Sequence, residues 1–243
     1  MDEITFRYAG DQAILAEFKN EISIETNRNV RSLHAALSAA GIFGVGELVP
    51  TYRALLIHYD PLKISPHELI AAVKECSGHL EDVSLPKAIV TEIPVCYEGE
   101  YALDIEHIAQ MENTTVENVI QIHSQSDYFV YMLGFSPGHA YTARMENPFS
   151  FKRLDTPRLR IPGGSIAVQL ALSNIIPLEQ PCGWNIIGTT PLLTYDPRRQ
   201  NPFLLQSGQW VHYVPVSRSD FEAIKADAER GTYVCRTYEK EDS

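Results

Sequence analysis

Short apolar runs separated by glycine and proline fill residues 134–216, and this pattern constrains the fold more than any other feature of the sequence. Four such runs are Ser165–Val168, Trp184–Ile187, Leu192–Tyr195 and Trp210–Val214. Short strands with turn residues between them are typical of barrels and sandwiches. The pattern therefore predicts that the C-terminal part of the chain forms a β-barrel or a β-sandwich.

The N-terminal part differs, because predicted strands and helices alternate there. Gly41 stands where the first helix should end, and Ser65 with Glu68 forms a capping box that opens the second helix. This order predicts a small two-layer α/β domain with a split βαβ arrangement. The predicted strands cover residues 4–8, 12–18 and 52–59, and the first helix covers residues 23–40.

A stretch of glycine, serine, proline and charged residues from Cys76 to Lys87 marks the domain boundary. We therefore expect domains over residues 1–86 and 87–243, and an α+β fold class. The second domain should combine its short strands with a C-terminal helix. Its other predicted elements are a strand over 89–96, a helix over 104–110, a helix opened by Thr114 and Glu117, and a last helix opened by Ser219 and Glu222.

The charge of the chain excludes some classes of partner. Twenty basic and 31 acidic residues give a net charge of −11, which disfavours nucleic acids and anionic membrane surfaces. No apolar run approaches the roughly 20 residues needed to span a bilayer. The four cysteines are scattered without a Cys-x-x-Cys pair, and the start of the chain is acidic. These features predict a cytoplasmic protein that binds neither nucleic acid nor membrane.

The densest cluster of chemically useful residues is Leu133–Tyr141. Gly134 and Gly138 flank a proline, which allows close backbone approach and exposes amide donors. His139 and Tyr141 could act as acid, base or hydrogen-bond donor. The alternative is a tight turn into a strand with an idle histidine, and spacing alone favours that turn.

Two further clusters follow in the chain. Arg158, close before Gly163 and Gly164, could hold a carboxylate or phosphate, and a surface arginine before a turn is an equal alternative. Cys182 lies beside Trp184 and could be a nucleophile, but nothing in the sequence places a base beside it. A small packing residue is the favoured interpretation of this cysteine, and Trp184 should pack in the barrel.

The eight histidines show no metal-binding spacing, so we expect no metal site. His123 lies on the apolar face of its predicted helix, as core histidines do. The sequence also lacks the Gly-x-x-x-x-Gly-Lys-Ser/Thr phosphate-binding loop.

In this order, the clusters resemble the family of the 5-oxoprolinase B subunit, also described as allophanate hydrolase subunit 1. The sporulation-kinase inhibitor of bacilli is a member. The resemblance covers nearly the whole chain. Its matching segments are Gly10–Asp11, Val49–Tyr52, Tyr59–Pro61, Ile93–Tyr97, His123, Tyr128, Leu133–Gly138, Tyr141, Pro157–Arg158, Ile161–Ser165, Gly183–Trp184, Gly188, Asp196–Pro197 and Val214–Val216.

The resemblance implies that the second domain is a cyclophilin-like β-barrel. It implies two partners, the cyclophilin-like C subunit and the A subunit of 5-oxoprolinase, in a complex that opens 5-oxo-L-proline to L-glutamate with ATP hydrolysis. Related modules in urea carboxylase handle carboxyl transfer to urea. A chain without its own phosphate-binding loop fits one that shares the active site with its partners.

The resemblance also implies roles for individual residues. His139, Tyr141 and His123 are the catalytic candidates, and Arg158 would bind an anionic group. The remaining substrate-binding candidates lie in the turns of the three clusters. They are Gly134, Phe135, Pro137, Gly138, Pro162, Gly164, Ser165, Trp184, Thr189 and Thr190.

Several positions depart from the family pattern. Leu172 stands where glutamine is usual, Ile176 where tyrosine is usual, and Thr189 where arginine is usual. His139 replaces phenylalanine, Asn174 replaces glycine and Cys182 also replaces glycine. Lost polar groups in one cleft indicate either a different substrate or a chain that no longer catalyses. The second hypothesis is therefore a regulator that binds a sensor histidine kinase, and a third is a carboxyltransferase-like module for a urea-derived substrate.

Overall fold

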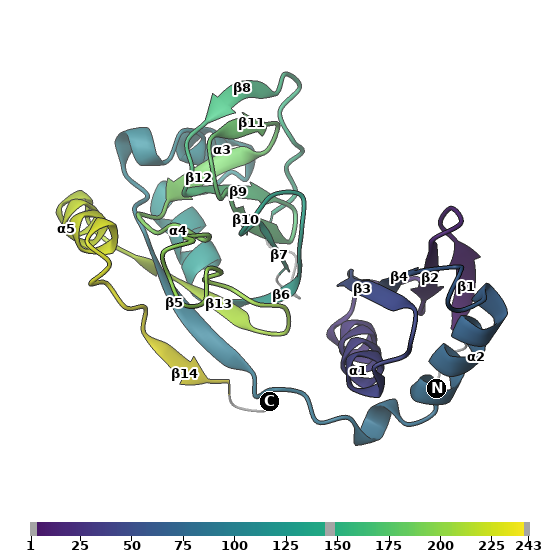
Figure 1. The fold of residues 1–243 in the computed structure, drawn as a ribbon. Coiled ribbons are helices and arrows are strands. Elements are labelled where there is room, and N and C mark those ends of the chain that lie inside the picture. The colour runs from purple at the N-terminus through teal and green to yellow at the C-terminus, as the bar shows by residue number, and fades with distance from the viewer. Residues whose placement is uncertain (1–3, 144–148, 241–243) are drawn as a thin grey trace. The chain divides into compact units, whose positions relative to one another are not determined.

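The computed structural model describes residues 4–143 and 149–240. The chain divides into two compact units, Met1–Lys87 and Ala88–Ser243 (Figure 1). Each unit combines strands with helices, which confirms the predicted α+β class. Across those described ranges, no helix is long and apolar enough to cross a membrane.

The first unit contains one four-stranded sheet in the order β1-β2-β4-β3, in which neighbouring strands are antiparallel. The strand β3 has no counterpart in the sequence prediction. It is an edge strand whose residues are half-buried or exposed, so it lacks an apolar alternation. The elements are β1 (Thr5–Tyr8), β2 (Ala13–Glu17), α1 (Ile24–Ala40), β3 (Val45–Pro50), β4 (Ala54–Tyr59), α2 (Pro66–Ser77) and the 3₁₀ turn η1 (Leu80–Asp82).

Local signals set the ends of both helices in the first unit. Gly41 closes α1 in the left-handed conformation, and Ser65 with Glu68 forms the predicted capping box of α2. The buried faces of the helices pack with β2 and β4 in one core. That core includes Val30, Leu33, Leu37, Leu55, Ile57, Leu69 and Val73.

The second unit is built on an eight-stranded sheet in the order β12-β9-β10-β7-β6-β13-β5-β14, and β8 with β11 forms a separate pair. Only the β13–β5 pairing is parallel among the strand pairs of the described residues. The strands are β5 (Ile89–Val95), β6 (Asp127–Leu133), β7 (Ala140–Ala143), β8 (Arg158–Ile161), β9 (Ser165–Gln169), β10 (Leu172–Ile175), β11 (Gln180–Cys182), β12 (Asn185–Thr189), β13 (Trp210–Pro215) and β14 (Thr237–Glu239). The helices are η2 (Gly99–Tyr101), α3 (Ile105–Met111), α4 (Val116–Ser124) and α5 (Arg218–Glu229).

The ends of β5 and β12 meet through Cys96 and Thr189. These two residues exchange both backbone hydrogen bonds, at 2.9 and 3.0 Å. Gly188 permits this approach, because a Cβ atom there would lie 2.6 Å from Val95 Cγ1. The sheet therefore curls back on itself, and the residues that follow β12 lie beside those that follow β5.

The predicted strand over Leu192–Tyr195 is wrong. This segment is a loop in which only Tyr195 makes an isolated bridge, with Phe203. Pro191 lacks a backbone donor, and the Leu192 amide bonds to Thr190 Oγ1 at 3.4 Å instead of to a neighbouring strand. The start of this segment is thereby held by a local contact.

Two predicted helix starts are displaced by one or two residues. Thr115, not Thr114, caps α4, because the Thr114 amide bonds back to Ala109 O in the preceding segment. Ser217, not Ser219, caps α5 and accepts from Asp220 N at 3.1 Å. Since β13 ends at Pro215, the extended backbone at Ser217 lets α5 begin directly after the strand.

Candidate functional site

The loop Thr189–Tyr195 is the place where the sequence clusters meet. Thr190 N donates to Gly164 O at 2.8 Å, and Gly164 N donates to Ile176 O at 2.7 Å. Gly164 has φ +86°, and a Cβ atom there would lie 2.3 Å from Thr190 O. Only glycine fits this contact, so the turn over residues 162–165 is locked against the loop.

The turn over residues 134–139 packs against the same loop from another segment. Gly138 has φ +81°, and a Cβ atom there would lie 2.7 Å from Thr194 Oγ1 and 2.8 Å from Tyr195 Cβ. The turn is closed by a bond from Gly134 N to His139 O at 3.0 Å. All three sequence clusters therefore contribute residues to one junction, although they are far apart in the chain.

A cleft of 470 Å³ opens beside this loop, within the size range of small-molecule sites. Its walls come from η2, the turn at Pro162, the loop after β12 and one face of α5. The lining residues are Glu100, Tyr101, Pro162, Gly163, Thr189, Thr190, Pro191, Leu192, Leu193, Asp196, Arg199, Phe221, Lys225, Ala228 and Glu229.

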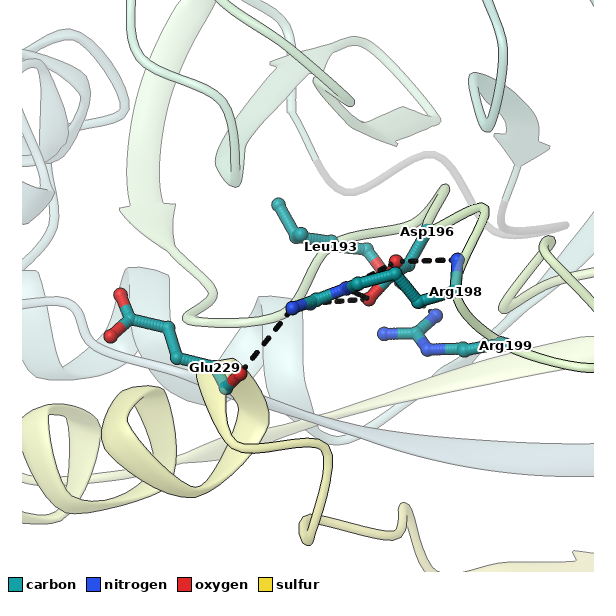
Figure 2. Close-up of polar contacts among 5 residues, drawn as sticks. All are labelled: Leu193, Asp196, Arg198, Arg199 and Glu229. Atoms are coloured by element: carbon teal, nitrogen blue, oxygen red, sulfur yellow. Dashed lines mark hydrogen bonds and ion pairs between the residues drawn. The ribbon is translucent and has the colours of Figure 1, made fainter.

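Contacts at both ends hold α5 over the cleft. At its start, Arg218 pairs with Glu100, and the Phe221 ring packs on Tyr101 with centroids 4.4 Å apart. At its end, Arg198 Nη1 donates to Glu229 O at 3.5 Å, as Figure 2 shows. This arginine satisfies a backbone oxygen that the helix end leaves unpaired.

Asp196 fixes the arginine that reaches α5. Arg198 donates from Nε and Nη2 to the Asp196 carboxylate at 2.9 and 2.7 Å (Figure 2). The hydrogen bonds from the Arg198 side chain, and after them the bond from the Arg198 backbone amide, lower the pKa of Asp196 to about 2. Arg199, next in the chain, donates to Leu193 O at 3.0 Å. Our site prediction from the sequence did not include Asp196, Arg198 or Arg199. The signal that could have indicated them is Asp196–Pro197, one of the matching segments of the resemblance.

His139 is buried beside this junction, with 6% of its surface exposed. Burial lowers the pKa of its imidazole, because the charged form loses hydration. Its ring lies between Phe135 and Tyr141, with centroid distances of 5.8 and 4.8 Å. Phe135 is 82% exposed and has φ +68°, an uncommon conformation for a bulky residue.

His123 lies elsewhere, in the core of the second unit. Its Nδ1 is 2.7 Å from Tyr97 Oη, and its Nε2 is 2.7 Å from Ser173 Oγ. Ser173 and Asn174 are consecutive in β10, so their side chains point to opposite faces of the strand. Since Asn174 contacts His139, the structure places the two candidate histidines on opposite sides of β10.

Arg158 and Trp184 also lie away from the cleft lining. Arg158 bonds to both carboxylate oxygens of Asp104, and Trp184 packs with an apolar cluster that contains Ile176. Burial raises the pKa of the nearby Cys182 thiol, which disfavours the nucleophilic thiolate.

The hydroxyl groups at the junction mostly have structural partners. Thr189 Oγ1 donates to Tyr101 O at 2.8 Å, and Ser165 Oγ donates to Pro162 O at 2.8 Å. Pro162, Thr189 and Thr190 line the cleft, whereas Gly164 and Ser165 do not. No group of three metal-ligating side chains gathers within residues 4–143 and 149–240.

Comparison with known proteins identifies clear relatives. A family model described as carboxyltransferase domain, subdomain C and D, matches residues 4–205. The 5-oxoprolinase B subunit of Bacillus subtilis (strain 168) is 33% identical over 240 residues, which cover 93% of this chain and 100% of that protein. The solved structure of a conserved uncharacterized protein from Pyrococcus horikoshii is 40% identical, covers 89% of this chain and 100% of its own, and has a TM-score of 0.52.

A larger enzyme shares the fold. The crystal structure of urea amidolyase from Kluyveromyces lactis superimposes with a TM-score of 0.81 over 98% of this chain. The two sequences are 19% identical, and the match covers only 16% of the amidolyase. This similarity therefore shows a common fold and nothing further.

Proposed function

The chain belongs to the carboxyltransferase domain family, subdomain C and D, together with the B subunit of 5-oxoprolinase, and we propose that it is the B subunit of an ATP-dependent 5-oxoprolinase. In this proposal, the complex opens 5-oxo-L-proline to L-glutamate. A cyclophilin-like C subunit and an A subunit complete the assembly, and ATP is supplied to the complex.

The observation that carries the proposal is the junction at Thr189–Tyr195. Three sequence clusters meet there beside a cleft of 470 Å³, which is ample for a five-membered lactam. An unstrained lactam resists hydrolysis, so activation of its carbonyl oxygen by ATP creates the leaving group. The role of this chain is to bind and orient the lactam while the partners contribute the nucleotide chemistry.

Two fold assignments belong to the same proposal. The second unit is a cyclophilin-like barrel, which the paired backbone bonds of Cys96 and Thr189 support. The first unit has a split βαβ core, because β2 and β3 are each antiparallel to the intervening β4 and therefore parallel to one another.

Residue roles follow from where the side chains lie. Pro162, Thr189 and Thr190 shape the cleft, and the turn from Gly134 to His139 forms the other side of the junction. We assign supporting roles to Arg158, Trp184 and His123, since each has partners within the fold.

Co-expression with the A and C subunits tests the function. The purified complex should release glutamate from 5-oxo-L-proline, and ATP hydrolysis should be coupled to this release. The A subunit must first be shown to be active. For this positive control, the same A and C subunits are assembled with the related B subunit of Bacillus subtilis in place of this chain. No turnover beside a working control would refute the proposal.

A second candidate is the regulator that binds a sensor histidine kinase. It is favoured by the substituted positions, because Ile176 is 3% exposed within an apolar cluster and Thr189 Oγ1 bonds to Tyr101 O. Because the side chains at these two positions take part in packing and hydrogen bonding within the fold, they are compatible with a chain that has lost catalytic activity. This candidate predicts reduced kinase autophosphorylation, and unchanged phosphorylation at saturating protein would exclude it.

A further inference from the structure

A second pocket lies within the first unit, outside the site described above. Its volume is 370 Å³, which is within the size range of small-molecule sites. The polar residues in its wall are Thr5, Arg7, Glu17, Lys19, Asn20 and Arg53. Three of these side chains are cations and one is an anion, whereas the whole chain has a net charge of −11. The wall of this pocket is therefore a local region of positive charge on an acidic chain.

Strand pairing brings part of this wall together. Thr5 in β1 lies opposite Glu17 in the neighbouring strand β2 (Figure 1). Because side chains alternate between the two faces of a strand, Arg7 shares a face with Thr5 and Glu17. Ala16 points to the other face, into the core that the strands form with α1 and α2. The three polar residues therefore lie on the face of the sheet opposite the helices.

Glu17 holds two arginines at the pocket. Arg7 Nε donates to Glu17 Oε2, and Arg53 Nη2 donates to Glu17 Oε1 at 3.2 Å. Glu17 itself is buried, with 8% of its surface exposed. The hydrogen bond from Arg7 is the largest of the effects that lower the pKa of Glu17, so its carboxylate stays ionised near neutral pH. One buried, charged acid thus fixes both guanidinium groups beside the pocket.

Most donors of the two guanidinium groups are left for a ligand. The bonds to Glu17 use only one nitrogen of each arginine. Within residues 4–143 and 149–240, Nη1 and Nη2 of Arg7 and Nε and Nη1 of Arg53 have no hydrogen-bond partner in the protein. Lys19 shares its charge with Glu21, at 2.8 Å, which is not part of the wall. The arginines are therefore the main donors of the pocket.

The arrangement of these donors selects the class of ligand. Guanidinium groups bind carboxylates and phosphates through pairs of parallel hydrogen bonds. A carboxylate has two oxygens in one plane, which a single arginine satisfies, whereas a phosphate group has three terminal oxygens that two arginines can share. A phosphate monoester carries a charge of about −1.5 to −2 at pH 7, which balances the excess of cations over anions in the wall. The pocket therefore fits a phosphate group better than a carboxylate.

We propose that this pocket binds the phosphate group of a small molecule, with Arg7 and Arg53 donating to the phosphate oxygens. Glu17 is the positioning residue for both arginines, and the side chains of Thr5 and Asn20 add neutral donors. The site lies wholly within the first unit and does not depend on the proposed function. A complex without 5-oxoprolinase activity would leave this inference intact, and a chain that binds no phosphate would leave the proposed function intact.

NMR titration of the isotopically labelled full chain with inorganic phosphate tests the site directly. The backbone amides of Arg7, Asn20 and Arg53 should shift in ¹H–¹⁵N spectra and reach saturation, with a Kd of about 1 mM or less. Acetate and sodium chloride at the same ionic strength control for screening and for carboxylate binding, and they should cause little shift. Shifts of equal size with acetate would overturn the proposal.

A parallel titration with AMP distinguishes a phosphate ester from the free ion. AMP carries the phosphate group on a nucleoside, and a pocket of 370 Å³ leaves room for part of that nucleoside, so we expect both probes to bind. Saturating shifts with AMP would identify a site for phosphate esters, and shifts with inorganic phosphate alone would identify the free ion as the ligand. Absence of saturating shifts with both probes would refute the site.

Arginine variants provide the second test. Arg7→Gln and Arg53→Gln each remove charged donors, so each should raise the Kd for inorganic phosphate by about tenfold or more. Arg28→Gln is the matched control, because it removes the same charge from an exposed position of α1 in the same unit and should leave the Kd unchanged. The amide spectrum of each variant without ligand shows whether the fold is retained. An unchanged Kd in both pocket variants, or an equal increase in Arg28→Gln, would contradict the proposal.

Discussion

Arg158 binds Asp104 through both guanidinium arms, at 2.9 Å from Nη1 to Oδ2 and 2.5 Å from Nη2 to Oδ1. The same carboxylate accepts from Ile186 N at 2.7 Å. One buried acid therefore joins the start of α3 to β8 and β12, with the arginine 54 residues away in the chain. The geometry therefore indicates that Arg158 stabilises the fold, whereas the resemblance implied that it binds an anionic ligand group.

Removal of this carboxylate should destabilise the second unit. Asp104→Ala deletes the acceptor of three hydrogen bonds, two of them from a charged donor, so we expect a loss of about 2–3 kcal/mol in the free energy of unfolding. Urea denaturation followed by tryptophan fluorescence measures it, because both tryptophans, Trp184 and Trp210, lie in this unit. The exposed Asp155→Ala is the control and should change stability by less than about 0.5 kcal/mol. Equal stability of the two variants would contradict the structural role.

Gly164 should tolerate no side chain. In Gly164→Ala the new Cβ atom would lie 2.3 Å from Thr190 O, and the backbone angle φ of +86° adds strain. We therefore expect the free energy of unfolding to decrease by about 2–4 kcal/mol. Gly99→Ala is the matched control, because Gly99 also has positive φ but has open space around its Cβ position. Its loss should stay near 1 kcal/mol. If both variants melted at the same temperature, the contact with Thr190 would be unimportant.

The bonds of His123 should matter for stability. Tyr97→Phe and Ser173→Ala each remove one partner of this fully buried ring, so each should cost about 1–3 kcal/mol. The double variant should show non-additive losses, because both bonds involve one imidazole. Thermal unfolding of the four proteins measures the coupling, and strict additivity would argue that the ring is not held as a unit.

Burial of His139 predicts a pH dependence of stability. Its pKa is lowered in the folded chain, so between that pKa and the usual 6.5 the unfolded state binds a proton that the folded state does not. Stability should therefore fall as the pH decreases from about 7 through this window. In His139→Phe the decrease should be smaller, and identical slopes for the two proteins in urea titrations at pH 5–7 would exclude this origin.

The thiols should react slowly. Burial raises the pKa of Cys182 and raises that of Cys235 to about 11, and the pKa values of Cys76 and Cys96 are raised for the same reason. Since the thiolate is the nucleophile, iodoacetamide at pH 7.5 should alkylate every cysteine more slowly than it alkylates free cysteine. Mass spectrometry of timed samples measures each site. A rapidly modified Cys182 would restore the nucleophile hypothesis.

Local interactions were predictable from the sequence. The capping box of Ser65 with Glu68 and the left-handed Gly41 each depend on residues within one helical turn, so short patterns were sufficient. The predicted strand over 89–96 corresponds to β5 for the same reason, because a short apolar run is itself the signal. Where two serines close together in the chain could serve as a cap, as at Ser217 and Ser219, the end of the preceding strand at Pro215 decided between them.

Contacts between residues that are distant in the chain were decided only by the tertiary structure. The resemblance implied catalytic roles for both His123 and His139, although the helix pattern already favoured a core position for His123, and the alternation of β10 places the two histidines on opposite faces of that strand. Leu192–Tyr195 had the apolar content of a strand but met no strand to pair with along its length. By itself, the sequence determined the α+β class, the end of α1, the start of α2 and the clusters that meet at the Thr189–Tyr195 loop. Strand pairing and the bonds of buried polar groups required the fold, because the energy of each depends on a partner that the chain supplies from far away.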